Sequence, residues 1–171
     1  MEQYPEFTFV QSQPQLYDYI KTDYPDIYKR IQKAVKTGNW EPNGAVWVEA
    51  DCNISSGEAL VRQILNGQRF FKEEFGVTSN VLWLPDVFGY SWALPQILKR
   101  SGIESFMTIK ISWNQYNHMP HDTFRWIGVD GSEVLTHFMS TPTFGDDGGY
   151  TYNGLIDPAS VKGVWDLYHD K

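Results

Sequence analysis

One stretch most constrains the fold of this chain: an apolar run that ends in Pro-Asp and passes through a turn into a helix. Val81 to Leu84 predicts a short buried strand, and Pro85 ends it because proline cannot donate a ladder hydrogen bond. Asp86 follows at the exit of this strand, and Ser91 is placed to cap a helix over residues 92–100. An acid at the carboxyl end of a parallel strand lies where α/β folds place their chemistry. The alternative is an acid that only ends the strand or caps the helix.

The same alternation of short apolar runs and amphipathic segments extends over about the first 115 residues. It predicts an α/β fold in which a parallel sheet is connected by crossover helices. Because polar residues follow successive strands, we expect part of a distorted parallel β/α barrel whose mouth collects them. A doubly wound open sheet also fits this pattern. The predicted strands are residues 7–10, 45–48, 81–84 and 105–109, and the predicted helices are residues 14–21, 25–37, 58–75 and 92–100.

The pattern changes in the C-terminal third of the chain. Thr123 to Ile127 and Glu133 to Phe138, joined by Asp130-Gly131, predict a β-hairpin. A loop rich in Gly, Asp and Tyr is predicted from Thr143 to Gly154, and a final helix from Pro158 to Tyr168. We find no internal repeat or linker, so residues 1–171 are expected to be part of one domain.

Composition excludes several classes of partner. The chain carries 14 basic and 21 acidic residues, a net charge of −7, which disfavours binding to the phosphates of nucleic acids. No apolar run is long enough for a membrane span. The one cysteine, Cys52, excludes an internal disulfide and fits a reducing compartment. Aromatic residues make up 16% of the chain; core packing explains most of them, but exposed rings would also suit a carbohydrate cleft.

Carboxylates are the strongest catalytic candidates. The sequence has no phosphate-binding glycine loop and no nucleophile elbow, and Cys52 has no histidine near it in the sequence. His118 and His121 have a spacing that a metal could use, although a solvated loop is the simpler interpretation. Asp51 and Asp86 both follow predicted strands, and two acids in one cleft suit glycoside hydrolysis or a hard metal cation.

Five segments of the chain form a distinctive set: WVEADCN at 47–53, SGEALVRQ at 56–63, WLPDVFGYS at 83–91, LPQI at 94–97 and KISWN at 110–114. Together they resemble the glycoside hydrolase family 38 α-mannosidases, in particular their bacterial, fungal and cytosolic branch. Shorter matches at residues 9–13, 130–132 and 137–138 extend the resemblance over nearly the whole chain.

This resemblance implies a distorted α/β barrel that hydrolyses terminal α-linked mannose with retention of configuration, aided by a zinc ion that holds the sugar hydroxyls. Asp86 inherits the role of nucleophile and also that of a zinc ligand. Phe88 corresponds to the aromatic residue beside the sugar, with a core phenylalanine as the alternative. Asp51 corresponds to a polar residue that lines the site. Tyr90, where relatives carry His, is grouped with the substrate-binding residues although its role is open.

The sequence also departs from the family pattern. It contains no His-x-Asp zinc pair, and the remaining zinc histidine and the general acid are expected beyond Lys171. Asp146 and Asp147 resemble the acid motif only superficially, and we interpret them as loop acids. Residues 1–171 are therefore expected to be an internal part of a cytoplasmic α-mannosidase, inactive alone and prone to self-association through exposed barrel edges. The alternative is a catalytically silent carbohydrate-binding or structural module derived from the same barrel.

Overall fold

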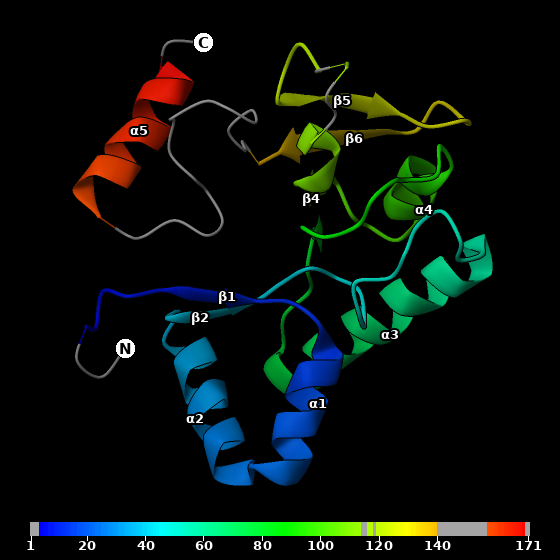
Figure 1. Cartoon of the computed structure of the whole chain (residues 1–171). Helices are drawn as coiled ribbons and strands as arrows, with labels where there is room; N and C mark the ends of the chain where they lie inside the picture. The colour runs from blue at the N-terminus through cyan, green and yellow to red at the C-terminus, as the bar shows by residue number, and fades with distance from the viewer. Residues whose placement is uncertain (1–3, 114–115, 118, 140–156, 170–171) are drawn as a thin grey trace.

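The computed structural model describes residues 4–113, 116–117, 119–139 and 157–169, which form a mixed α/β fold (Figure 1). The predicted loop over 143–154, with Asp146 and Asp147, lies outside the described residues, as does His118. The elements in chain order are β1 (Phe9–Gln11), α1 (Pro14–Asp23), α2 (Pro25–Lys36), β2 (Trp40–Pro42), α3 (Gly57–Phe75), β3 (Val81–Leu84), α4 (Leu94–Arg100), β4 (Ser105–Thr108), the 3-10 helix η1 (Lys110–Trp113), β5 (Thr123–Ile127), β6 (Glu133–Phe138) and α5 (Pro158–His169).

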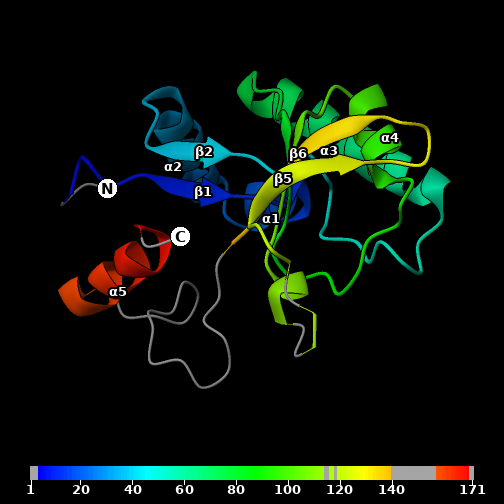
Figure 2. The same cartoon turned by 90° about the horizontal axis from the view of Figure 1, so that it is seen from above.

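The strands form two sheets. The larger sheet has the order β3-β4-β6-β5, with β3, β4 and β6 parallel and β5 antiparallel to β6. The smaller sheet pairs β1 and β2 in parallel, and an isolated parallel bridge between Gly44 and Leu82 links the segment after β2 to β3. Figure 2 shows the two sheets side by side in a view from above. No pairing among the described strands closes a barrel, so the barrel stays a prediction.

The predicted strand at 45–48 is wrong. These residues form bends, and the strand lies earlier, at Trp40–Pro42. Gly44 and Ala45 both have positive φ, 101° and 64°, which turns the chain out of the extended conformation. Ala45 and Val46 are nevertheless fully buried, and a Cβ on Gly67 of α3 would overlap their backbone. The apolar run therefore marks a loop that is packed against a helix.

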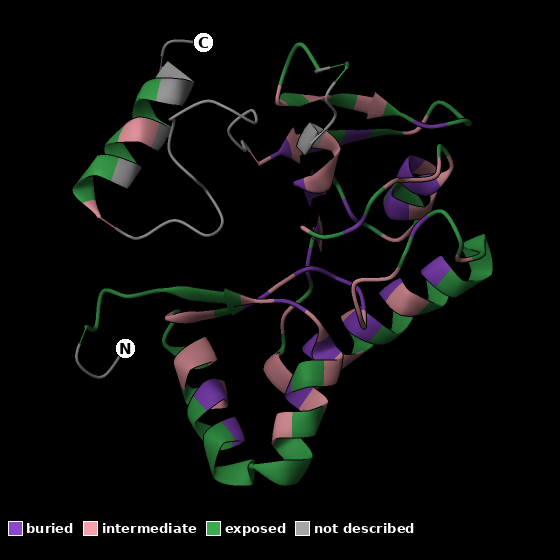
Figure 3. Cartoon of the chain, viewed as in Figure 1, coloured by how far each residue is buried: buried purple, intermediate pink, exposed green. Residues whose placement is uncertain are grey.

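Helix α3 forms much of one side of the core. Ser56 caps its first turn by accepting a hydrogen bond from the Ala59 N–H (3.2 Å), and Gly76, with φ of 70°, ends it. The apolar pattern of residues 58–75 predicts that Leu65 faces inward, but Leu65 is exposed because it is rotated about 100° around the helix from Ile64. Figure 3 shows the buried residues as a row along one side of α3. That row consists of Leu60, Ile64, Gly67 and Phe71.

Two hydrophobic clusters share α3. The first lies between α3, α4 and the larger sheet and is mostly aliphatic, with Leu82, Leu84 and Leu98 almost fully buried. The second is aromatic and joins α1, α2 and α3; its Tyr17 and Phe71 rings meet edge to face at 5.8 Å. The apolar pattern of α2 predicts that Ile27 faces inward, and this is wrong: Ile27 is exposed and Tyr28 is buried. The aliphatic cluster anchors β3 and β4, and so fixes where their exits lie.

The predicted self-association depends on strand edges of the two sheets that are left unpaired in the described part of the chain. Among the described residues, β1 and β2 are both edges of the smaller sheet and β3 and β5 are the edges of the larger one, and Phe9 and Val10 on β1 are exposed. Self-association through such edges stays a prediction. Within the part of the chain that is described, no helix combines the length and apolar character needed to cross a membrane.

Candidate active site

Asp86 and Lys110 meet at the exits of two neighbouring parallel strands. β3 and β4 pair in a register that sets Leu84 beside Thr108. Asp86 follows Leu84 by two residues, and Lys110 follows Thr108 by two residues. Residues at equal distance beyond a parallel pair remain side by side, so the register brings these two side chains together. The Lys110 ammonium forms an ion pair with Asp86, with Nζ 3.1 Å from Oδ1.

This ion pair is asymmetric in burial. The side chain of Lys110 is 9% exposed and that of Asp86 is 62% exposed. A buried ammonium requires compensation by negative charge or hydrogen bonds, whereas the exposed carboxylate could be solvated without help. Lys110 is therefore the fixed partner, and Asp86 presents its remaining carboxylate surface to the solvent side of the strand exits.

Phe88 stands beside the same lysine. Its ring is 77% exposed, so it is not a core phenylalanine in this structure. The Lys110 ammonium lies 5.7 Å from the ring centroid, within the range of a cation–π contact. Lys110 thus contacts two of the three predicted site residues that follow β3, Asp86 and Phe88.

Tyr90 ties the loop after β3 to the sheet. Its hydroxyl donates to the Val87 carbonyl (2.9 Å) and shares a hydrogen bond with Thr108 Oγ1 at the end of β4. Its ring packs against Phe106 at 4.9 Å, and burial raises the pKa of the phenol. These contacts give Tyr90 a structural part; its substrate contact stays a prediction.

Glu49 is a second carboxylate near Asp86. Its Oε1 accepts hydrogen bonds from Gln13 Nε2 (3.3 Å) and Ser12 Oγ (3.5 Å), both just after β1. Gln13 has a φ of 64°, a left-handed conformation that is uncommon for a residue with a side chain. Burial raises the pKa of Glu49; the hydrogen bond from Ser12 opposes this rise, and the negative charge of Asp86 adds to it. The negative charge of Asp86 therefore disfavours ionisation of Glu49.

Asp51 is held in a tight turn of its own. Its Oδ1 accepts the backbone N–H groups of Asn53 (2.8 Å) and Ile54 (2.7 Å). The next residue, Cys52, forms an isolated parallel bridge with Tyr90, so this turn lies against the loop that follows Asp86. Burial raises the pKa of the Cys52 thiol to about 11, which makes this cysteine a packed thiol and a poor nucleophile.

Metal-ligand geometry is sparse in the described residues. Among them, no group of three or more His, Cys, Asp and Glu side chains could enclose a metal ion. His137 lies on β6 and its Nδ1 hydrogen-bonds Thr123 Oγ1 at 2.9 Å across the strand pair. His137 alternates with core positions along its strand, which predicts a structural role, and this contact within the sheet agrees with that prediction.

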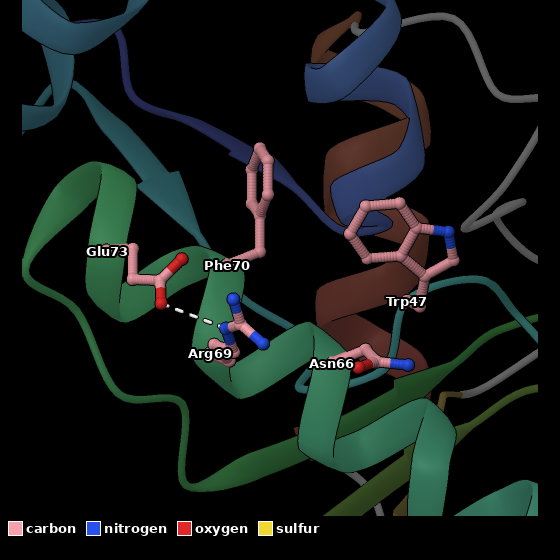
Figure 4. Close-up of a pocket in the computed structure, with 5 residues that line it drawn as sticks. All are labelled: Trp47, Asn66, Arg69, Phe70 and Glu73. Carbon is pink, nitrogen blue, oxygen red and sulfur yellow. Dashed lines mark hydrogen bonds and ion pairs between the residues drawn. The ribbon is translucent and has the colours of Figure 1, made fainter.

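A hollow lies away from these strand exits, on the outer face of α3 (Figure 4). Its volume is about 350 Å³, and Trp47 and Phe70 form aromatic walls with their rings nearly perpendicular at 5.6 Å. Arg69 and Glu73 pair at 2.9 Å across one side, and Asn66 completes the lining. None of the residues predicted for the site lines this hollow.

Sequence reasoning did not assign roles to Lys110 and Glu49. Both were visible as polar residues directly after predicted apolar runs, the signal that identified Asp86 and Asp51. Their partners were not visible, because those depend on strand register and on the fold of the segment after β1.

Comparison with known families supplies the decisive observation. The family model described as the Glycosyl hydrolases family 38 N-terminal domain matches residues 1–171. The chain belongs to glycosyl hydrolase family 38. This confirms the family that the motifs indicated.

Two relatives within the family share about half of their aligned residues with this chain. It is 52% identical over 144 residues to Alpha-mannosidase G of Dictyostelium discoideum, covering 84% of the chain and 13% of that protein. It is 51% identical over 148 residues to Alpha-mannosidase 2C1 of Homo sapiens, covering 86% of the chain and 14% of the relative. The chain therefore spans about one seventh of the length of these family 38 relatives.

A solved structure supports the fold. The crystal structure of an alpha-mannosidase from Enterococcus faecalis V583 superimposes with a TM-score of 0.74 at 19% identity, covering 99% of this chain and 19% of that one. At this identity the similarity concerns the arrangement of elements, and it agrees with the mixed α/β fold described above.

Proposed function

We propose that these residues form part of the active site of an α-mannosidase, in which Asp86 is the catalytic nucleophile. The observation that carries the proposal is the exposed Asp86 carboxylate at the exit of β3, held by the buried Lys110 ammonium at 3.1 Å. Support also comes from the relatives named as α-mannosidases. Because the chain spans only part of their length, the proposal concerns a protein of that length that contains residues 1–171.

The proposed reaction proceeds in two displacements with overall retention. An oxygen of Asp86 bonds to the anomeric carbon while the bond from this carbon to the departing oxygen breaks. A carboxylic acid side chain from outside the described residues donates a proton to the departing oxygen. Water then attacks the anomeric carbon and gives its proton to that same side chain. The bond to Asp86 breaks, mannose is released, and the Asp86 carboxylate is regenerated.

Three further residues are proposed to contact the sugar. Phe88 offers an exposed ring next to Asp86, which suits the apolar face of a pyranose. Asp51 has committed Oδ1 to its turn, so contact would use its other oxygen. For Tyr90 the hydroxyl is engaged internally, so contact would use the edge of its half-buried ring.

The proposed site also holds zinc, and the described residues would supply only part of its ligands. Asp86 would supply one carboxylate oxygen, because it is exposed and carboxylates ligate Zn²⁺. The described residues do not complete a ligand set, so the other ligands would come from elsewhere in the longer protein. Bound there, zinc would polarise sugar hydroxyls as a Lewis acid.

The wider setting is also proposed. The parallel strands β3, β4 and β6, with the bridge from Gly44 to Leu82, suit one part of a barrel that further strands would close. The substrate class is a mannose-containing oligosaccharide or glycoside. A cytoplasmic location, the absence of nucleic-acid and membrane partners, and inactivity of residues 1–171 alone stay predictions.

A trapping experiment tests the nucleophile directly. The longer protein is incubated with a fluorinated α-mannosyl fluoride, whose ester forms faster than it is hydrolysed, and is then digested for mass spectrometry. We expect the added fluoromannosyl mass on the peptide that contains Asp86, and proton NMR should show that the α-anomer of mannose is released first from an ordinary substrate.

Label on a different carboxylate, or release of the β-anomer first, would remove Asp86 from the nucleophile role. Binding of mannosides without turnover by the intact protein would favour the catalytically silent module instead. Residues 1–171 alone serve as the matched control, and turnover by this piece would overturn its predicted inactivity.

A further inference from the structure

The lysine that meets Asp86 is unusual in its surroundings. Lys110 begins the short helix η1, directly after β4, and its side chain is 9% exposed. Lysine is almost never buried unless it is paired, because its charged ammonium loses hydration. A neutral side chain would pack there at lower cost, so the charge calls for an explanation in terms of what it contacts.

Two contacts of the Lys110 ammonium lie at the β3 exit. The ammonium is 3.1 Å from Asp86 Oδ1 and 5.7 Å from the centre of the Phe88 ring. These two residues are an acid and an aromatic group that are themselves exposed to solvent. The Lys110 side chain, which is 9% exposed, thus contacts two exposed groups of the proposed site, and this supports a role toward those groups.

Charge around Asp86 gives a second reason for this lysine. The negative charge of Asp86 helps to raise the pKa of Glu49, so the two carboxylates repel each other when both are ionised. The Lys110 ammonium, 3.1 Å from Asp86 Oδ1, offsets this repulsion.

We propose that Lys110 is a positioning residue that fixes the carboxylate of Asp86 and the ring of Phe88 for reaction. With Oδ1 held 3.1 Å from the ammonium, the rotation of the Asp86 carboxylate is restricted before it reacts with the anomeric carbon. This inference rests on the proposed function, since it assumes that Asp86 is the nucleophile. It adds a residue whose effect passes through Asp86 and that takes part in no bond exchange.

The test compares variants of the longer protein, assayed with zinc in the buffer on aryl α-mannosides with good and poor leaving groups. Lys110→Met keeps the apolar stem and removes the charge, whereas Lys110→Arg keeps the charge. Lys99→Met, an exposed lysine at the end of α4, is the matched control. Thermal melting and fluoromannosyl labelling of Asp86 are recorded for each variant.

We expect Lys110→Met to lower kcat about 100-fold with both leaving groups, as misplacement of a reacting group does. Its KM should change less than about threefold, because substrate binding does not require an oriented nucleophile. The rate of labelling at Asp86 should fall in parallel. The kcat of Lys110→Arg should be at least about tenfold higher than that of Lys110→Met, and the kcat of Lys99→Met should match that of the unchanged protein.

Each contrary result has a defined meaning. Activity of Lys110→Met within about threefold of the unchanged protein overturns the inference, as does a loss confined to the poor leaving group, which would make Lys110 an acid. If Lys110→Met does not fold, Lys110→Gln replaces it; failure of both to fold would show that Lys110 maintains the fold, and would overturn the positioning role.

Asp86→Asn is measured alongside to separate the two proposals. If it remains active, the nucleophile assignment fails. If it is inactive while Lys110→Met is active, only the positioning role fails.

Discussion

Asp86 and Asp51 were predicted from the same signal, an acid directly after an apolar run, yet their surroundings differ. Asp86 follows a true strand and pairs with Lys110, a lysine with a 9% exposed side chain that follows the neighbouring strand β4. Asp51 follows a bent loop and accepts two backbone N–H groups of its own turn. The first acid is held by a partner distant in sequence, and the second holds its own local backbone. Position at the end of an apolar run therefore does not determine what an acid does; its partner does.

The largest effect is expected for Asp86→Asn, which should lower kcat by at least about 10³-fold because an amide cannot form the glycosyl ester. Folding should be nearly unaffected, because the amide oxygen can still accept from Lys110. Activity on an activated aryl α-mannoside and the melting temperature are measured in the longer protein. Asp26→Asn, an exposed acid on α2, is the control and should stay within about threefold. Near-normal kcat in folded Asp86→Asn would remove the distinction between the two acids.

Phe88→Leu should have the next largest effect, lowering kcat/KM about 10- to 30-fold through loss of the ring beside the sugar. Because the ring is exposed, the melting temperature should not change measurably. Steady-state kinetics measure kcat/KM and calorimetry measures the melting temperature. Tyr4→Leu is the control, since it replaces an exposed aromatic residue that is distant from Phe88 in the sequence. A fall in stability without a fall in activity would assign Phe88 to packing.

Two substitutions of Asp51 should separate its role as a hydrogen-bond acceptor in the turn from the role of its charge. Asp51→Ala removes the acceptor for two N–H groups and should cost about 1–2 kcal/mol of stability, or roughly 3–6 °C in melting temperature. Asp51→Asn keeps an acceptor oxygen and should cost less than about 0.5 kcal/mol. We expect about tenfold lower kcat/KM for Asp51→Ala. If Asp51→Asn is as inactive as Asp86→Asn, Asp51 contributes to catalysis directly and the contrast between the acids disappears.

Glu49→Gln should have the smallest effect, about threefold in kcat/KM, and should increase stability at neutral pH. The folded-state pKa of Glu49 is raised, so the folded protein binds its proton more tightly than the unfolded chain does. Ionisation of Glu49 therefore lowers stability above the folded pKa, and this cost disappears below its ordinary value of 4.5. Melting curves from pH 8 to pH 4 should show Glu49→Gln about 1–2 °C more stable at pH 8, with the difference vanishing toward pH 4. A difference independent of pH would contradict burial of an ionised Glu49.

Local signals determined much of the fold. Pro14, Pro25 and Gly76 mark helix boundaries that the structure reproduces, since proline fits a first helical turn and glycine adopts the left-handed conformation after a last one. Strand β3 was also predicted at its observed bounds. These features depend on neighbouring residues alone, and so they can be predicted from the sequence.

Other predictions failed where packing decides the outcome. The run from Ala45 to Val48 has the composition of a strand, but Gly44 turns the chain and Gly67 allows the loop to approach α3 closely. Leu65 and Ile27 are apolar but lie off the stripes that meet the core. An apolar side chain shows that burial is favourable, but the neighbouring elements determine whether room exists.

The sequence by itself determined the family, the order of most elements and the candidate nucleophile, because motifs and caps are local properties. Only the tertiary structure decided what surrounds Asp86. The register of β3 against β4 selects Lys110 as its partner, and the fold of the segment after β1 brings Gln13 to Glu49. These pairings join residues up to 36 positions apart, and their energies depend on distance and burial, which no local pattern encodes.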